Sequence, residues 1–192
     1  MRIVGGSHRG RRLLAPAGDI VRPTSDRARE AVFDILSHGK LAAEGVPFAG
    51  QPVLDAFAGT GAYGLEALSR GAASAAFVEQ DRAALDSLRR NIAALGVQDR
   101  TETIHGDATR PPRARQACAV AFLDPPYRSG FAVPAMAALG EQGWLAADAL
   151  IVVEIGAREA FTPPPGFAML DERIYGAARL LILRRGPTEE AG

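Results

Sequence analysis

The tetrapeptide Asp124-Pro125-Pro126-Tyr127 directly follows an apolar run at 120–123 and could support chemistry on an amine. An exocyclic amine of a nucleobase is a poor nucleophile, because its lone pair is delocalised into the ring. The Asp124 carboxylate and the Pro125 carbonyl can accept its two N–H hydrogens, so that the lone pair points at an electrophilic carbon. The two prolines stiffen the turn by fixing φ at about −65°, and Tyr127 can stack on a base swung out of its helix or loop. The motif predicts methyl transfer to a base amine, although by itself it also fits a strand-ending turn with a helix cap.

A second motif lies at 53–68, where an apolar run ends at Asp55 and a glycine-rich bend leads into helical spacing. Gly59 and Gly61 allow a sharp turn and a close approach to a ligand, because they have no Cβ. The pattern predicts a strand, a tight turn and a helix whose amino end faces the crevice above the strands, where such folds bind cofactors. A short glycine pattern also fits a plain turn or a nicotinamide site.

Three carboxylates, those of Asp55, Glu79 and Asp107, close or follow successive predicted strands and would line one edge of the sheet. Glu79 is placed to accept from ribose hydroxyls, and Asp107 is placed for the exocyclic amine of an adenine. An adenosine-bearing cofactor fits this set. S-adenosylmethionine has a sulfonium and no phosphate, so an acid-lined turn suits it. A nicotinamide dinucleotide stays open but is less suited, since the bend ends in Ala62-Tyr63-Gly64 and not in a full Gly-x-Gly-x-x-Gly.

Strands and helices alternate along the chain, which predicts an α/β fold with a mainly parallel sheet covered on both faces. The first expected helix, at 26–36, has an apolar stripe, and Arg27, Arg29 and Glu30 are expected off this stripe. Glycine marks two helix ends, at Gly71 and Gly96. Seven strands are expected in chain order: two that end at residues 55 and 79, one at 101–104, one that leads into Asp124, and three at 150–154, 167–170 and 180–183. Three further helices are expected: one that ends near Arg70, one at 81–95 and one at 132–139.

The amino-terminal segment is basic. Residues 1–29 hold seven arginines and two aspartates, whereas the formal charge of the whole chain is zero. Clustered arginines suit a nucleic-acid backbone, because guanidinium pairs bidentately with phosphate oxygens. A solvated terminus of an arginine-rich protein is the alternative. The candidate RNA-binding residues are Arg2, His8, Arg9, Arg11, Arg12, Arg22 and Arg27.

Size and composition favour one globular unit. The chain has 192 residues, of which 47% are hydrophobic and 23% are charged, as in ordinary globular domains. We expect a basic arm or hairpin at 1–22, a catalytic domain at 23–186 and a flexible tail at 187–192. The single cysteine, Cys118, allows no internal disulfide and is expected to fill a buried strand. No signal core, membrane span or metal-ligand spacing is found in the sequence, so we expect a cytoplasmic protein without a metal. We also expect a monomer.

Together these motifs resemble S-adenosylmethionine-dependent methyltransferases that modify exocyclic amino groups of nucleobases. More narrowly, the chain is similar to the RsmD family over nearly its whole length. The resemblance implies a seven-stranded, Rossmann-like class I methyltransferase sheet with a small amino-terminal hairpin. It implies methyl transfer to N2 of a guanine in 16S ribosomal RNA, within the small subunit or its assembly intermediate. The segments that carry it are 1–6, 22–27, 30–33, 55–61, 64–72 and 124–127.

The resemblance also assigns residues. Catalysis would fall to Asp124, Pro125, Pro126 and Tyr127. Two features depart from the family: Tyr63 stands where a small or aliphatic residue is usual, and the stretch after Tyr175-Gly176 is more apolar than usual. The residues implied to bind the cofactor, S-adenosyl-L-methionine, are Asp55, Phe57, Ala58, Gly59, Thr60, Gly61, Glu79, Gln80, Asp107 and Ala108.

Three other functions stay open at this point. A DNA adenine-N6 or cytosine-N4 methyltransferase would share the catalytic turn, but no large extra region for reading a DNA sequence is found. A nicotinamide oxidoreductase would share the glycine turn. A nucleic-acid-binding module that keeps a vestigial fold would bind RNA without depending on a cofactor.

Overall fold

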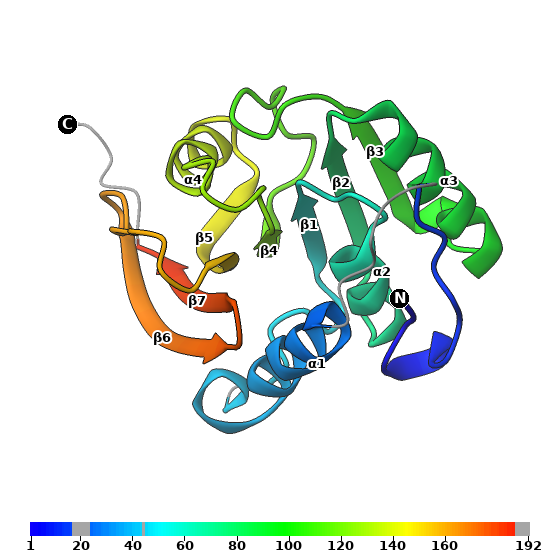
Figure 1. The fold of residues 1–192 in the computed structure, drawn as a ribbon, viewed down its shortest axis with the longest axis horizontal. Helices are drawn as coiled ribbons and strands as arrows, with labels where there is room; N and C mark the ends of the chain where they lie inside the picture. The colour runs from blue at the N-terminus through cyan, green and yellow to red at the C-terminus, as the bar shows by residue number, and fades with distance from the viewer. Residues whose placement is uncertain (17–23, 44, 187–192) are drawn as a thin grey trace.

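Seven strands form a single mixed sheet in the order β3-β2-β1-β4-β5-β7-β6 (Figure 1). The computed structural model describes residues 1–16, 24–43 and 45–186. The predicted seven-stranded α/β fold is confirmed. The strands are β1 (Pro52–Ala56), β2 (Ser74–Glu79), β3 (Thr101–His105), β4 (Cys118–Leu123), β5 (Leu145–Gly156), β6 (Phe167–Tyr175) and β7 (Ala178–Arg185); the helices are α1 (Thr24–Ser37), α2 (Ala62–Ser69), α3 (Arg82–Leu95) and α4 (Ala132–Glu141), with short 3-10 turns η1 (Gly6–His8), η2 (Gly39–Ala42) and η3 (Gln98–Arg100).

Five neighbouring strands are parallel, from β3 at one edge to β5. Among the described strands, β7 alone runs opposite to the other six, because it pairs antiparallel with both β5 and β6. The carboxyl ends of β1, β2 and β4 therefore meet at one edge of the sheet, which we call the carboxyl edge. The in-register pairing of Asp55 with Phe77 and Phe122 aligns these ends.

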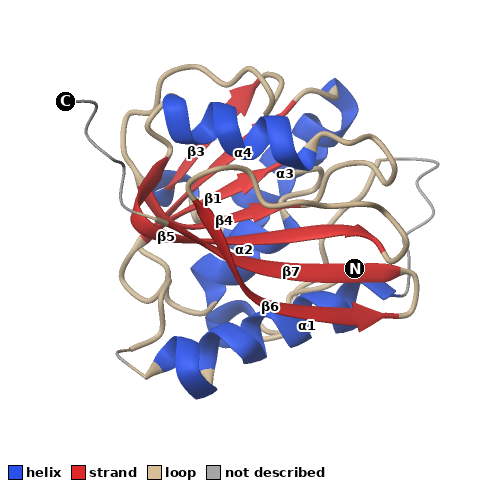
Figure 2. Ribbon diagram, turned by 90° about the vertical axis from the view of Figure 1, so that its left-hand side faces the viewer, coloured by secondary structure: helices blue, strands red, loops and turns tan. Residues whose placement is uncertain are grey.

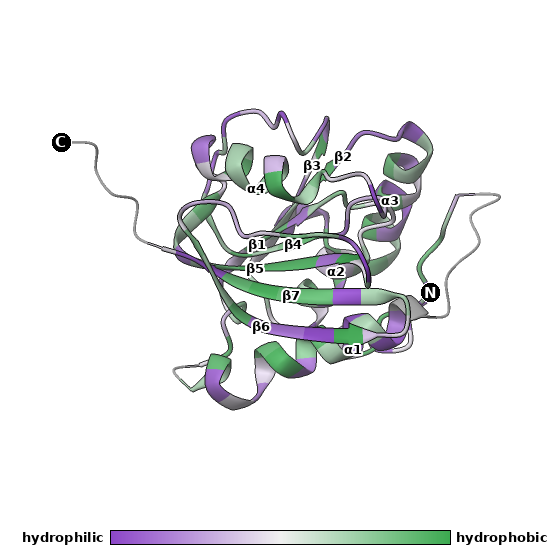
Figure 3. Cartoon of the chain, turned by 60° about the vertical axis from the view of Figure 1, so that its left-hand side comes forward, coloured by the Kyte–Doolittle hydropathy of each residue, from purple (hydrophilic) through white to green (hydrophobic). Residues whose placement is uncertain are grey.

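Strands β5, β6 and β7 are longer than the apolar runs predicted. The prediction ended β6 at Leu170, because the polar residues 171–173 interrupt its apolar run. In the structure β6 continues to Tyr175, with a bulge between Met169 and Asp171. An edge strand needs a backbone partner on one side only and can expose polar side chains. Figure 3 shows this long hydrophilic segment on β6, beside the more hydrophobic β7.

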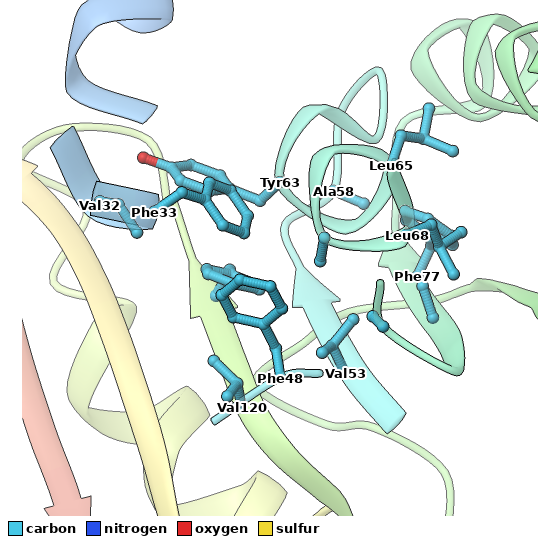
Figure 4. Close-up of a cluster of buried hydrophobic side chains, with 14 of the residues drawn as sticks. Val32, Phe33, Phe48, Val53, Ala58, Tyr63, Leu65, Leu68, Phe77 and Val120 are labelled. Atoms are coloured by element: carbon cyan, nitrogen blue, oxygen red, sulfur yellow. The ribbon is translucent and has the colours of Figure 1, made fainter. Parts of the chain in front are cut away.

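The helices lie on the two faces of the sheet, with α4 on one side and α1 on the other (Figure 2). Two hydrophobic clusters result, one beneath α1, α2 and α3 and one beneath α4. On the α1 side, Phe33 packs edge-on against Phe48 with ring centroids 5.3 Å apart, and Tyr63 stacks on Phe122 at 5.2 Å. Figure 4 shows Phe33, Phe48 and Tyr63 gathered there. Burial of such aromatic side chains stabilises the layer strongly.

The cysteine and the helix ends behave as predicted. Cys118 is buried at the start of β4, and burial raises the pKa of its thiol to about 12, so it is unreactive. Helix α3 begins after Asp81, whose carboxylate accepts from the Ala84 N–H at 2.8 Å, and ends at Gly96 in the left-handed conformation. Within the described ranges, no helix is long and apolar enough to cross a membrane.

The first sixteen residues form an irregular hairpin, with Arg2 bridged to Arg12. Its apolar side chains Ile3 and Leu13 are buried in the same cluster as α1 and α2. The described part of the arm is thus packed onto the sheet domain. The boundary at residue 22 and the tail at 187–192 stay predictions, because 17–23 and 187–192 lie outside the described residues.

A buried carboxylate, that of Glu66 on α2, joins this hairpin to two helices. Its side chain is 0% exposed and accepts from the N–H groups of Val4 and Gly5, both at 2.8 Å. It also pairs with Arg70 at 2.7 Å and with the Nε of Arg29 at 3.6 Å. Three hydrogen bonds, from Val4, Gly5 and Arg70, and the nearby charge of Arg29 therefore stabilise one carboxylate that is out of contact with water.

The prediction that Arg29 lies off the buried face of its helix is wrong. Arg29 is 1% exposed, and its guanidinium also donates to the Asp26 carboxylate and to the Arg2 carbonyl, at 2.8 and 2.5 Å. A long side chain of this kind reaches the core when an anion waits there. Glu66 on α2 is that anion. The apolar periodicity of α1 alone cannot predict a partner on another helix.

We predict that Glu66→Ala lowers the free energy of unfolding by about 3–5 kcal/mol, because it leaves the Val4 and Gly5 N–H groups without their acceptor and the buried Arg29 with Asp26 as its remaining carboxylate partner. Urea denaturation measures the change. The matched control is Glu102→Ala, which breaks a pair whose Arg115 is 85% exposed and should cost less than about 1 kcal/mol. Equal losses in the two variants would contradict the role given to Glu66.

Candidate active site

One pocket of about 250 Å³ lies at the carboxyl edge. It brings together residues from both sequence motifs, because β1 and β4 are adjacent and parallel. From the glycine turn Phe57 lines the pocket, and from the second motif all four residues of the Asp124–Tyr127 corner line it. The glycine turn and the Asp124–Tyr127 corner therefore border the same space. The lining residues are Phe57, Val78, Glu79, Gln80, Gly106, Ala108, Asp124, Pro125, Pro126 and Tyr127.

The glycine turn is tightly specified. Phe57 has φ 65°, a conformation that few residues other than glycine adopt, and it lines the pocket. Gly61 precedes α2 with φ 83°, and a Cβ there would lie 2.3 Å from a Leu88 methyl carbon. The N–H of Ala58 donates to the Val78 carbonyl and the N–H of Gly61 donates to Ala58. Strained backbone held in this way is typical of functional sites.

Asp55 lies beneath this turn and is 2% exposed. Its carboxyl accepts from the Gly64 N–H at 2.8 Å. Burial raises the pKa of Asp55 to about 8, against the opposing effect of the Gly64 hydrogen bond, and the charge of Glu79 raises it further. A largely neutral Asp55 therefore supports the turn through its hydrogen bond to Gly64. A direct contact of Asp55 with the cofactor stays a prediction.

Glu79 ends β2 and points both oxygens at backbone donors. One accepts from the Gly59 N–H at 2.6 Å and the other from the Asp81 N–H at 2.7 Å. The carboxylate is 8% exposed and still lines the pocket, where it keeps lone pairs for a hydroxyl. Gln80, beside it, is exposed.

The third predicted carboxylate lies just behind the pocket wall. Asp107 accepts from the N–H and the hydroxyl of Thr109, both at 2.8 Å. Its neighbours Gly106 and Ala108 line the pocket, whereas Asp107, Ala58, Gly59, Thr60 and Gly61 are not among the lining residues. The cofactor roles of these five residues, and of the predicted residues that do line the pocket, stay predictions.

At the Pro-Pro corner, Asp124 is exposed and Pro125 is buried. The Tyr127 hydroxyl donates to one oxygen of Glu154 at 2.9 Å, and the Tyr63 hydroxyl donates to the other oxygen at 2.9 Å. Glu154 lies in β5 and is 9% exposed. One carboxylate thus fixes the ring of the tyrosine predicted to stack on the target base.

Sequence reasoning missed Glu154, and it noted Tyr63 only as a departure from the family. Burial, then the charges of Glu154 and Asp124, raises the pKa of Tyr63 well above its usual value, so its hydroxyl remains a donor. A usable signal was present: Glu154 ends the apolar run at 150–153, as Glu79 ends its own. The link to Tyr63, 91 residues earlier, exists only in the folded chain.

The predicted RNA-binding residues are spread along the hairpin and α1. Arg2, Arg9, Arg11, Arg12 and Arg27 are exposed, and Arg22 lies outside the described residues.

The turn of the hairpin is remote from the pocket. The His8 N–H donates to the Ser69 hydroxyl at 2.9 Å and its ring lies 3.1 Å from the Leu95 carbonyl. Ser69 and Leu95 end α2 and α3, which run back from the carboxyl edge. Figure 1 shows the hairpin turn below the sheet, away from the tips of β1 and β2. The open end of the hairpin, by contrast, reaches the glycine turn, where Met1 contacts Thr60. The RNA contacts stay predictions.

A family model described as conserved hypothetical protein 95 matches residues 1–184. Ribosomal RNA small subunit methyltransferase D of Escherichia coli (strain K12) is 35% identical over 96% of this chain and 90% of its own length. The enzyme of the same name from Haemophilus influenzae is 34% identical, over 92% and 89%. The chain belongs to the RsmD family. The resemblance inferred from the sequence motifs is confirmed.

Solved structures agree with this placement of the chain in the RsmD family. A methyltransferase from Escherichia coli superposes with a TM-score of 0.81, is 34% identical and covers 97% of this chain and 98% of its own. An RNA methyltransferase from Salinibacter ruber, solved with S-adenosyl-L-homocysteine, is 15% identical with a TM-score of 0.64 over 89% and 98%. The second likeness shows the fold alone, which is the class I methyltransferase fold.

We predict a specific pH dependence of stability from Asp55. Its pKa is about 8 in the fold and 3.8 in its unperturbed state. Between these values the folded carboxyl holds a proton that the unfolded chain releases, so the wild type loses stability as the pH rises from about 4 to about 8. Asp55→Asn keeps an oxygen for the Gly64 N–H but does not titrate. Relative to this variant, the wild-type free energy of unfolding should fall by up to about 1.4 kcal/mol per pH unit.

Urea denaturation of both proteins between about pH 5 and about pH 8 tests the prediction. Two stability curves that stay parallel over this range would show that Asp55 does not titrate differently in the fold.

Proposed function

We propose that this RsmD-family protein transfers a methyl group from S-adenosyl-L-methionine to the N2 amine of a guanine in 16S ribosomal RNA. The observation that carries the proposal is the shared pocket, in which Glu79 and the Asp124–Tyr127 corner face one space. The two curated relatives named above are ribosomal RNA small subunit methyltransferases. Family membership and this geometry point to the same chemistry.

The residues present fit an adenosine-bearing cofactor. Glu79 is held by two backbone N–H groups and offers acceptors for ribose hydroxyls. Phe57 and Val78 add apolar surface, and Ala108 leaves room beside them. Position 61 requires glycine, because its φ is positive and a Cβ there would collide with the Leu88 side chain. S-adenosyl-L-methionine supplies an electrophilic methyl group when bound.

The protein's own part in the transfer is to orient the amine. The Asp124 carboxylate and the Pro125 carbonyl accept the two N–H hydrogens of the guanine N2, which directs the nitrogen lone pair at the methyl carbon. Pro125 and Pro126 keep these acceptors in place. Tyr127, tied to Glu154, stacks on the guanine and limits its motion.

Two alternatives are less well supported. A pyrophosphate needs free backbone donors, and in the glycine turn the N–H groups of Ala58, Gly59 and Gly61 already donate within the protein. This disfavours a nicotinamide dinucleotide. A DNA methyltransferase would share the Pro-Pro corner, but the curated relatives named above act on ribosomal RNA by name.

The substrate context belongs to the same proposal. The basic residues at 1–29 and the RsmD relatives support an RNA partner, which we take to be the small subunit or its assembly intermediate. Work on that particle would place the enzyme in the cytoplasm. A monomeric state is part of the proposal and calls for a sedimentation measurement.

Replacement of Asp124 tests the proposed function. Asp124→Ala removes an acceptor of the amine, so we expect methyl transfer to fall by about three orders of magnitude or more. Affinity for S-adenosylhomocysteine, measured by calorimetry, should stay within about threefold of the wild type. The substrate is the small subunit from a strain that lacks the enzyme, and duplex DNA serves as the comparison. Full activity of the variant, or transfer to DNA alone, would refute the proposal.

A second prediction concerns the hydrogen bond between Glu154 and Tyr127. Tyr127→Phe and Glu154→Gln each weaken this bond, and we expect each to lower kcat by about 3- to 30-fold with an unchanged affinity for S-adenosylhomocysteine. Because both act on the same ring, the double variant should be no worse than the poorer single one. Tyr127→Ala, which also removes the stacking surface, should raise KM for the RNA substrate as well. Multiplicative losses in the double variant would show that Glu154 does not act through Tyr127.

A further inference from the structure

A second hollow adjoins the active-site pocket along the carboxyl edge. Its volume is about 750 Å³, and Tyr127 lines both spaces. The remaining wall is built from the chain after β4, the residues 156–159 after β5, and the turn at 176–177 between β6 and β7. All three segments lie at the same edge, because β6 runs in the direction of β5. The hollow therefore continues the pocket on the far side of Tyr127.

Arg128 is held in this hollow by a strained backbone. Its φ is 62°, which is uncommon for a residue with a long side chain. The Arg128 N–H donates to the Glu159 carboxylate at 2.8 Å, and the same oxygen lies 3.3 Å from the Gly156 nitrogen. One carboxylate thus clamps the loops after β4 and β5 together. The clamp fixes where the Arg128 side chain leaves the backbone, next to Tyr127.

The hollow carries two available guanidinium groups. Arg128 and Arg158 are both exposed, and neither forms an ion pair within residues 1–16, 24–43 and 45–186. The one carboxylate in the wall, that of Glu159, accepts two backbone hydrogen bonds at its Oε2 atom and forms no ion pair with either arginine. Two arginines on neighbouring loops match the oxygens of a phosphate, since each guanidinium can donate two parallel hydrogen bonds.

We propose that Arg128 and Arg158 bind the phosphate of a nucleotide next to the target guanosine. The proposal rests on the proposed function and deepens it. A base that enters the pocket beside Tyr127 keeps its strand attached, so the neighbouring phosphate lies within one nucleotide of that ring. The hollow lies at this position, beside Tyr127, and Arg128 and Arg158 line it. Such contacts fix the register of the strand and carry no base specificity.

The turn of the amino-terminal hairpin lies by the ends of α2 and α3, away from the active-site pocket. The arginines near this turn therefore do not reach the phosphate next to the target guanosine. We therefore expect two separate RNA contacts. The hairpin would add affinity for the larger RNA particle, whereas the hollow would position the strand at the reacting base.

The test compares two double variants that each remove two positive charges. Arg128→Gln with Arg158→Gln empties the hollow of its cations. Arg113→Gln with Arg115→Gln is the matched control, because both residues are exposed and precede β4 at the opposite edge of the sheet. The assay measures KM and kcat on small ribosomal subunits from a strain that lacks the enzyme, over a range of salt concentrations. Calorimetry with S-adenosylhomocysteine checks that the cofactor pocket is intact.

We expect the hollow variant to raise KM for the subunit by about 10-fold or more and to reduce the slope of log affinity against log salt by about 1. The control should match the wild type within about twofold. Arg128→Lys with Arg158→Lys keeps the charges and should recover most of the affinity at low salt, which a role in folding alone would not predict.

Two results would overturn the inference. If the wild type is active and the hollow variant shows the same KM and salt slope as the control, the hollow does not bind the strand and the proposed function still stands. If the wild type binds S-adenosylhomocysteine but methylates no ribosomal RNA, the proposed function fails and this inference fails with it.

Discussion

Backbone N–H groups in irregular segments need acceptors once they leave water, and in this protein side-chain carboxylates provide many of them. Glu66 accepts from Val4 and Gly5 and so holds the amino-terminal hairpin on the domain. Glu79 accepts from Gly59 and Asp81, and Glu159 accepts from Arg128. Each of these bonds fixes a loop that no strand or helix ladder would hold. The carboxyl edge is an ordered surface for this reason.

The same bonds set the chemistry of the site. Glu79, which we propose to bind the cofactor ribose, is held in position by hydrogen bonds from the Gly59 and Asp81 N–H groups. Glu154 binds two tyrosine hydroxyls, so the ring of Tyr127 has one position and not several. Stacking on a base is most effective when the aromatic surface is rigid before the base arrives. Tyr63 is the buried half of this arrangement, because its hydroxyl donates to the second oxygen of Glu154.

Prediction from the sequence succeeded where a local pattern is tied to a local structure. Apolar runs located all seven strands, and Asp81 and Gly96 marked the ends of α3. It failed where a partner distant in the chain decides. Arg29 was placed off the buried face, although Glu66 draws its guanidinium into the core. The second half of β6, after Leu170, was not predicted, because it has no apolar run and is held as a strand by its pairing with β7.

The sequence alone determined the order of strands and helices, the glycine turn, the Asp124–Tyr127 corner and the family, because these depend on residues close together in the chain. The tertiary structure decided which residues share a space. In the folded chain Glu154 lies between Tyr63 and Tyr127, and Asp55 lies beneath the glycine turn. Arg128 and Arg158 line one hollow. These relations depend on strand order, register and burial, which bring together residues far apart in sequence and which no short pattern encodes.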